Sequence, residues 1–299
     1  MNAPCLSAPP STSGPLLSES DFAALARVIH LETGIFMPPG KRALMQSRLA
    51  KRLAARGLGS FREYRELVES RSDPDEIGLM ISALTTNITR FFREGQHFDD
   101  LREKVLPGLL AQARAGGRIR MWSAGCSTGE EPYSMALSVL ALCPEAPRLN
   151  IRILATDLDP VVIATAKAAR YPAAALANLP DDVATGASRP DKADPEFVRI
   201  REDARKLISF RVLNLLHDWP FGGQFDVIMC RNVVIYFDAE TRDRLWTRFA
   251  ALQPSGARIY VGHSERIAGE VGALYVPSGI TAYTRTETPP PGRGRSIAK

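Results

Sequence analysis

Cysteine and histidine are scarce in this sequence. Four of its 299 residues are cysteine and four are histidine, and no two cysteines have the C-x-x-C spacing of a ligand pair. Disulfide frameworks and structural zinc sites depend on such pairs. We therefore predict no disulfide framework and no bound metal.

Long apolar runs are also missing, and we expect no secretory leader. No stretch approaches the ~18–20 uncharged apolar residues that a membrane-spanning helix needs. The first residues, MNAPCLSAPPSTSGP, lack the basic region followed by an apolar one that marks a secretory signal. We predict a cytoplasmic protein that does not insert into a membrane.

The remaining composition is that of an ordinary globular protein. Hydrophobic residues make up 45% and charged residues 24% of the chain, and a chain of this length forms about two domains at roughly 100–200 residues each. The net charge is +5 and the pI about 9.1. Such a mild excess of positive charge favours acidic partners without requiring nucleic acid. We expect a monomer with no nucleic-acid partner.

The N-terminal part of the chain has the pattern of helices. Residues 18–90 contain four helical segments bounded by serine, proline and glycine signals, which predicts an all-helical domain. Residues 91–117 are expected to form a linker and the first helix of the next domain. Residues 1–17 and 288–299, rich in small residues and proline, are expected to be flexible tails.

The pattern changes at residue 118. From 118 to 287, short apolar runs alternate with helical segments, which predicts a doubly wound α/β domain whose ligands bind at the carboxyl ends of its strands. The expected strands are 118–125, 151–157, 206–215, 225–237, 257–263 and 280–286, and the expected helices are 130–143, 160–170 and 239–252. A polar, proline-broken insert at residues 172–206 predicts a small subdomain.

A glycine-containing loop, WSAGCSTGEEPYS, follows the first expected strand. Gly125 and Gly129 allow a ligand to approach the main chain closely, but the loop has neither the G-x-G-x-x-G pattern nor a Walker lysine. Glu130 and Glu131 instead favour a cationic group, such as an ammonium or a sulfonium. The alternative is a helix start whose acidic residues interact with the helix dipole.

Asp157 directly follows the second expected strand. An acidic residue at this place commonly binds ribose hydroxyls in nucleotide-binding sheets. The alternative is a cap for the following helix, for which Asp159 is equally placed. Together with the glycine loop, Asp157 favours the ribose contact.

Two further polar segments fall where the ligand edge of the sheet is expected. In NITRFFRE, residues 87–94, the two phenylalanines fit interdomain packing, whereas Asn87, Thr89 and Arg93 could meet a ligand carboxylate. In CRNVVIYF, residues 230–237, the candidates are Arg231, Asn232 and Tyr236, while the intervening apolar residues fit simple packing. Asn214 and Leu215 end the preceding strand and could contact an adenine.

One helical segment is strongly basic. Six basic residues and no acidic one occur between residues 41 and 56: Lys41, Arg42, Arg48, Lys51, Arg52 and Arg56. Solvated faces normally mix charges of both signs. The unmixed charge therefore favours an acidic macromolecular surface, and both a nucleic acid and an acidic protein helix are compatible with it.

Taken together, NITRFFRE, WSAGCSTGEEPYS, ATDLD, NLL, CRNVVIYFD and GHSE occur in the order and spacing of a known family. The chain resembles the CheR-type chemotaxis receptor glutamate O-methyltransferases over roughly residues 18–285. The resemblance implies an N-terminal helical domain, then a class I (Rossmann-like) methyltransferase domain with a small inserted β-subdomain. It also implies S-adenosylmethionine as methyl donor, S-adenosylhomocysteine as product, and the cytoplasmic helices of methyl-accepting chemotaxis receptors as partner.

The resemblance also implies residue roles. The positions that correspond to the family's cofactor site are Asn87, Thr89, Arg93, Glu130, Asp157, Asn214, Leu215, Arg231 and Asn232. Tyr236 corresponds to a tyrosine near the transferring methyl group and, with Arg93, to the catalytic positions. The basic segment corresponds to the element that faces the acidic receptor helices, with Lys41, Arg48, Lys51, Arg52 and Arg56 as substrate-binding residues.

One segment departs from the family pattern. Some relatives dock on a C-terminal pentapeptide of receptors through an aromatic strand of the β-subdomain, and residues 181–200 lack that strand. The departure argues against such docking. Two rival functions remain open: an S-adenosylmethionine-dependent nucleic-acid methyltransferase, and a non-catalytic regulator that binds the cofactor. The missing dinucleotide glycine pattern places an NAD-dependent oxidoreductase well behind both.

Overall fold

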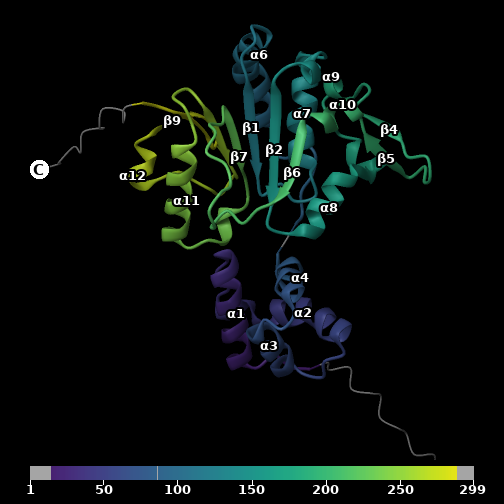
Figure 1. Ribbon diagram of the computed structural model, residues 1–299, viewed down its shortest axis with the longest axis vertical. Helices are drawn as coiled ribbons and strands as arrows, with labels where there is room; N and C mark the ends of the chain where they lie inside the picture. The colour runs from purple at the N-terminus through teal and green to yellow at the C-terminus, as the bar shows by residue number, and fades with distance from the viewer. Residues whose placement is uncertain (1–14, 86, 288–299) are drawn as a thin grey trace, which may run out of the picture. The chain divides into compact units, whose positions relative to one another are not determined.

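The chain folds into two compact units. The computed structural model describes residues 15–85 and 87–287, which divide into a helical unit ending at Thr85 and an α/β unit of residues 33–35 and 87–287 (Figure 1). The division lies ahead of residues 87–90, which were expected in the helical domain. No helix of the described ranges is long and apolar enough to cross a membrane.

Most of the two predicted tails, residues 1–14 and 288–299, lies outside the described residues. Leu17, however, is buried, and its amide donates to Oε1 of Gln46 at 3.0 Å. Fixed structure therefore begins before residue 18, where the N-terminal tail was expected to end.

Four helices build the helical unit: α1 (Glu19–Thr33), α2 (Arg42–Arg56), α3 (Phe61–Ser70) and α4 (Pro74–Leu84). A 3₁₀ turn, η1 (Pro39–Lys41), precedes α2, and Gly57 ends it in the left-handed conformation with φ 65°. Met45, Leu49 and Leu53 recur every four residues along α2 and are fully buried, so they form the stripe by which this helix joins the core.

Glu76 of α4 is the polar centre of the helical unit. Its side chain is 1% exposed, and its carboxylate accepts hydrogen bonds from Arg52 (2.6 and 3.0 Å) and from the hydroxyl of Tyr64 (2.8 Å). The guanidinium of Arg56 lies 3.3 Å away. Because these partners come from α2 and α3, the carboxylate ties three helices together.

The basic face predicted on α2 is therefore only partly open. Arg52 and Arg56 are paired with acidic residues of their own chain, and Arg48 donates to the main-chain oxygens of Leu84 and Thr85 at 2.6 and 3.0 Å. The segment 41–56 holds no acidic residue of its own, but the acceptors for these arginines lie on α4 and on the residues that flank it. Lys41 and Lys51 are exposed.

Seven strands form the sheet of the α/β unit, in the order β6-β2-β1-β7-β8-β10-β9. They are β1 (Ile119–Ala124), β2 (Ile151–Asp157), β6 (Ile208–Val212), β7 (Val227–Cys230), β8 (Arg258–Val261), β9 (Tyr275–Gly279) and β10 (Ala282–Arg285). The first five in this order are parallel, whereas β10 runs antiparallel to both of its neighbours.

Both faces of the sheet are covered, as the continuously apolar strands predicted. Met121, Val227 and Met229 belong to one buried cluster, and the alternating Trp122, Ile228 and Cys230 belong to the other. The first face is covered by α5 (Gly95–Asp100), the π-helical turn η2 (Leu101–Val105), α6 (Leu106–Arg114), α7 (Glu130–Leu142) and α8 (Pro160–Ala168), and the second by α11 (Ala239–Ala251) (Figure 1).

The predicted insert contains a small antiparallel sheet, with strand order β3-β5-β4. Its strands are β3 (Arg170–Pro172), β4 (Ser188–Pro190) and β5 (Phe197–Ile200), with a 3₁₀ turn η4 (Ala173–Leu176) and α9 (Asp181–Ala184) between them and α10 (Glu202–Lys206) after them. Short helical turns η3 (Ala146–Arg148) and α12 (Gly269–Gly272) complete the unit.

Two strand predictions were wrong. Residues 225–237 were expected to form one strand, but β7 ends at Cys230, Asn232 is left-handed with φ 60°, and residues 234–236 form the 3₁₀ turn η5 (Val234–Tyr236). Strand β9 was not predicted, because its five residues include a proline and a glycine. It lies at the edge of the sheet, where proline is tolerated.

The buried charge in the helical unit gives a stability prediction. Replacing Glu76 with alanine leaves Arg52 and the Tyr64 hydroxyl without their acceptor, so we expect Glu76→Ala to lower the unfolding free energy of this unit by about 3 kcal/mol. Hydrogen exchange of the α2–α4 amides measures this change. The matched control is Glu66→Ala, which removes an exposed pair with Arg62 and should change stability by less than about 1 kcal/mol. Equal effects of the two variants would contradict the assignment.

Candidate functional site

The candidate site lies where the order of the parallel strands reverses. From β1 the chain passes to β2 on one side, whereas β7 lies on the other side of β1. In open α/β sheets, ligands bind at such a switch point, beyond the carboxyl ends of the strands. The three strands end at Ala124, Asp157 and Cys230, so the glycine loop, Asp157 and the segment CRNVVIYF lie at this edge.

The glycine loop after β1 needs its glycines for steric reasons. Gly125 and Gly129 have φ values of +84° and +101°. A Cβ on Gly125 would collide with the Val233 side chain, and one on Gly129 would lie 2.8 Å from the Tyr171 hydroxyl. The amides of Gly125 and Cys126 both donate to the Thr156 oxygen at 2.8 Å. The loop is thus packed onto the end of β2.

The carboxylate of Asp157 holds the glycine loop at the end of β2. It accepts hydrogen bonds from the amides of Ser127 (2.8 Å) and Asp159 (3.0 Å). Burial raises its pKa, although these hydrogen bonds oppose the shift. Asp159, the alternative cap, does cap α8 by accepting from the Val161 amide at 2.8 Å. The capping role is therefore taken by Asp159, which leaves Asp157 at the strand end.

The segment 87–94 also contacts the glycine loop and the residues that follow β2. Asn87 donates from its side chain to Asp159 at 3.0 Å, and its main-chain oxygen accepts from the Ser127 hydroxyl at 2.8 Å. Phe91 packs edge-on against Tyr171, with 5.0 Å between ring centroids. This contact lies within the α/β unit, whereas the phenylalanines were expected to pack between domains. Thr89 is half-buried, and Arg93 donates to the Ile88 oxygen at 3.1 Å.

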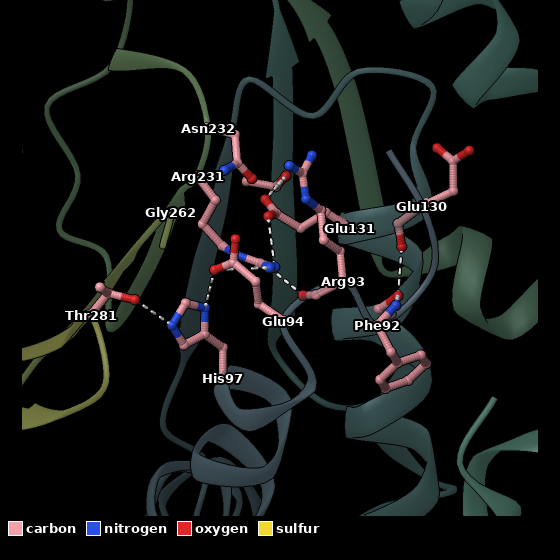
Figure 2. A network of polar contacts seen from close by, with 12 residues as sticks. Phe92, Arg93, Glu94, His97, Glu130, Glu131, Arg231, Asn232, Gly262 and Thr281 are labelled. Carbon is pink, nitrogen blue, oxygen red and sulfur yellow. Dashed lines mark hydrogen bonds and ion pairs between the residues drawn. The ribbon is translucent and has the colours of Figure 1, made fainter. Parts of the chain in front are cut away.

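The two glutamates that begin α7 have different surroundings. Glu131 is in a buried network, where it accepts from the Ser123 hydroxyl at 2.7 Å and lies 3.2 Å from the guanidinium of Arg231. The Glu130 carboxylate accepts from the Thr128 hydroxyl at 2.7 Å and points away from that network (Figure 2). Burial raises the pKa of both groups. A cationic ligand group beside Glu130 would offset this cost.

Arg231 is the centre of the buried network. Its side chain is 2% exposed, and besides Glu131 it contacts Glu94 at 3.6 Å and donates to the main-chain oxygen of Arg93. Figure 2 shows the guanidinium between the two glutamates. These contacts give Arg231 a positioning role within the site, and its predicted place in the cofactor site stays a prediction.

The remaining predicted residues follow β7 and β6. Tyr236, in η5, is 38% exposed. Asn214 accepts from the Leu216 amide at 2.9 Å through its side-chain oxygen, and Leu215 is buried against the second face of the sheet. The amide of Asn232 donates to Glu265 at 3.0 Å. Glu265 was noted only within the GHSE motif, and its contact with the β7 loop could not be read from the sequence.

The described cysteines and acidic residues were searched for groups that could ligate a metal. Within residues 15–85 and 87–287, no three His, Cys, Asp or Glu side chains are grouped as metal ligands. Cys126, Cys143 and Cys230 are buried and have free thiols. The groups gathered at the site include carboxylates, amides, a guanidinium and a tyrosine hydroxyl.

His97 joins this network to residues 280 and 281, which directly precede strand β10. Its Nε2 donates to the Ile280 oxygen at 2.9 Å and lies 2.9 Å from the Thr281 hydroxyl, while Nδ1 lies 3.5 Å from Glu94 (Figure 2). Burial, followed by the positive charge of Arg231, lowers the pKa of His97 to about 4, against the opposing effects of Glu94 and Asp100.

This shift predicts how stability depends on pH. Below its ordinary pKa of 6.5, His97 gains a proton in the unfolded chain but stays neutral in the folded one. The stability present above pH 6.5 is therefore lost as the pH falls toward 4, by about 2–3 kcal/mol. We expect the unfolding free energy of His97→Gln to fall by about 2–3 kcal/mol less than that of the wild type between pH 7.5 and pH 4.5. Urea unfolding at the two pH values measures this difference. The exposed His263, replaced by glutamine, is the control, and an unchanged pH dependence in His97→Gln would contradict the assignment.

Comparison with known proteins gives the family. The CheR methyltransferase all-alpha domain matches residues 20–85, and the CheR methyltransferase SAM binding domain matches residues 87–281. The boundary between the two matches agrees with the division of the structure at residues 85–87. The resemblance seen in the sequence motifs is confirmed.

Relatives of known name match along nearly their whole length. A probable chemotaxis protein methyltransferase of Rhizobium etli is 46% identical over 260 residues, which cover 87% of this chain and 97% of that protein. The chemotaxis protein methyltransferase of Escherichia coli K12 is 35% identical over 269 residues, or 89% of this chain and 91% of that protein. The chain therefore belongs to the CheR methyltransferase family and is an enzyme with the S-adenosylmethionine-binding domain of that family.

Proposed function

We propose that the chain transfers a methyl group from S-adenosylmethionine to glutamate side chains on the cytoplasmic helices of chemoreceptors, with S-adenosylhomocysteine as the second product. The family and the names of the relatives support this assignment. The observation that carries it is a pair of carboxylates at the switch point: Glu130 follows the glycine loop, and Asp157, at the end of β2, accepts a hydrogen bond from Ser127 of that loop. They suit a ligand that has both a positive charge and a diol.

The chemistry of these donors fits the cofactor. Glu130 is assigned to the methionine ammonium, because its carboxylate points away from the buried ion pairs and burial raises its pKa. Asp157 is assigned to the ribose hydroxyls, since a carboxylate that accepts two amide hydrogen bonds retains further lone pairs. The residues assigned to the rest of the cofactor are Asn87, Thr89, Arg93, Asn214, Leu215 and Asn232.

A carboxylate substrate needs little from the enzyme beyond position. When bound, S-adenosylmethionine supplies a methyl group activated by its sulfonium. A glutamate side chain has a pKa of about 4.3 and is already ionised at neutral pH, so no general base is required. The loop from Asn232 to Tyr236 has no histidine, lysine or acidic residue that could act as one. Tyr236, exposed on this loop, is assigned to orient the reacting groups.

The inserted sheet supports an enzyme that does not capture a receptor tail by strand addition. Its edge strands, β3 and β4, have only three residues each, and they end in Pro172 and Pro190. Proline cannot donate to an added strand, and short edges offer few sites for pairing. We therefore propose that a receptor tail does not pair with these edges, in line with the departure of residues 181–200 from the family pattern.

The first experiment identifies the chemical bond formed. We expect the protein, incubated with methyl-labelled S-adenosylmethionine and a receptor cytoplasmic fragment, to give label that mild base releases as volatile methanol. Carboxyl methyl esters hydrolyse under these conditions, whereas methylated nitrogen does not. A receptor fragment with its methylated glutamates replaced by alanine is the control.

The other outcomes distinguish the rival functions. Base-stable label on the receptor, or label on added nucleic acid, would contradict the proposal and favour a nitrogen or nucleic-acid methyltransferase. Binding of S-adenosylmethionine without transfer to any of a panel of receptors would favour the non-catalytic regulator.

The helical unit is proposed to bind the acidic receptor helices through α2. Lys41 and Lys51 are exposed, whereas Arg48, Arg52 and Arg56 combine any such role with their contacts to α4. We expect Lys41→Glu combined with Lys51→Glu to raise the KM for the receptor fragment by about 10-fold at low salt, because each exposed charge pair contributes up to about 1 kcal/mol.

Two controls accompany this measurement. The affinity for S-adenosylmethionine, measured by calorimetry, should not change in the double variant. Lys167→Glu alters an exposed lysine of α8 and should leave the KM for the receptor unchanged. An unchanged KM in the double variant, or an equal effect of high salt on all three proteins, would overturn the assignment of α2.

A further inference from the structure

The loop after β7 is held by a residue to which no role has yet been given. Residues 231–236 leave the strand through the left-handed Asn232 and end in the single turn η5. The carboxylate of Glu265 accepts hydrogen bonds from the amides of Asn232 (3.0 Å) and Val234 (2.9 Å). It also accepts one from the Gly262 amide at 2.6 Å. The carboxylate thus replaces the main-chain acceptors that the turn lacks.

The GHSE sequence explains how the carboxylate reaches the loop. The Glu265 amide donates to the Gly262 oxygen at 2.8 Å, which folds the segment into a turn. A Cβ on residue 262 would lie 2.6 Å from the Asn232 nitrogen and 2.7 Å from Oε2 of Glu265. Only glycine at this position allows the turn and the loop to approach so closely. Gly262 and Glu265 are therefore both needed for the turn to contact the β7 loop.

Burying the carboxylate of Glu265 costs desolvation free energy. Glu265 is 3% exposed, and burial raises its pKa although its amide hydrogen bonds oppose the shift. An apolar side chain of similar size would avoid the desolvation cost. The carboxylate differs from such a side chain in one respect: it fixes several amides in one geometry, as an anion does in a nest of main-chain donors.

We propose that Glu265 is a positioning residue for methyl transfer, which sets the conformation of residues 232–236 and thereby the places of Asn232 and Tyr236. This inference rests on the roles assigned to those two residues above. The start of the loop is fixed separately, because Arg231 is held by Glu131 and Glu94. Glu265 therefore controls the part of the loop that Arg231 does not.

The test is a double-mutant cycle. Glu265→Gln keeps the shape of the side chain but turns an NH₂ group toward main-chain amides, which also donate. We expect kcat to fall by about 10- to 100-fold, as is typical when hydrogen bonds to a charged group are lost. In a Tyr236→Ala background the same substitution should lower kcat less than about 3-fold, because the group that it positions is already absent.

Controls separate positioning from folding. Ser264→Ala changes the exposed neighbour in the same turn and should leave kcat and the melting temperature unchanged. Should Glu265→Gln fail to fold, Glu265→Asp keeps the charge with a shorter reach, and its kcat should fall between those of the wild type and of Tyr236→Ala. A full, multiplicative loss in both backgrounds, or an unchanged kcat in Glu265→Gln, would overturn the inference.

Failure of the assigned roles gives a different result. If Tyr236→Ala alone leaves kcat unchanged, the role assigned to Tyr236 is wrong. If the wild type forms no methyl ester, the proposed reaction is wrong. The cycle is then measured with Asn232→Ala on the Kd of S-adenosylmethionine, which needs no receptor. Coupling of Glu265 to Asn232 in that cycle supports the inference, and independent effects overturn it.

Discussion

The buried guanidinium of Arg231 is the interaction on which the rest of the candidate site depends. It joins three segments that are far apart in the chain: the end of β7, the start of α7 through Glu131, and the segment 93–94 through a main-chain oxygen and Glu94. Removing a charge from water costs several kcal/mol unless each partner is well placed. A displaced segment would therefore leave an unpaired buried charge, which disfavours other arrangements of these three segments.

Buried carboxylates also fix two loops of the site. Asp157 holds the glycine loop through the Ser127 amide, and Glu265 holds the β7 loop through the amides of Asn232 and Val234. In each case a side chain from one strand end fixes the main chain of a neighbouring loop. Loops without regular hydrogen bonding acquire in this way the rigidity that the positioning of two reactants requires.

Much of this arrangement follows from local sequence. The glycine loop, Asp157 and the helix starts were predictable because steric need, strand ends and capping are local properties. The end of β7 was not, since VVIY continues the apolar pattern and only the distant Glu265 draws its amides out of the sheet. The pairing of Arg52 with Glu76 was not predictable for the same reason, because the carboxylate comes from another helix. Sequence patterns predict elements well, and they fail where a distant charge determines the geometry.

The distribution of charge completes the argument. The chain has a net charge of +5, yet its candidate cofactor edge presents the carboxylates of Glu130 and Asp157. Such an edge attracts a cationic cofactor and repels an anionic receptor glutamate. The attraction for the receptor must therefore come from elsewhere, and the exposed Lys41 and Lys51 of the helical unit supply positive charge. Under the proposed function, the α/β unit attracts the cationic cofactor and the helical unit attracts the acidic receptor. A single binding surface of one charge could not attract both.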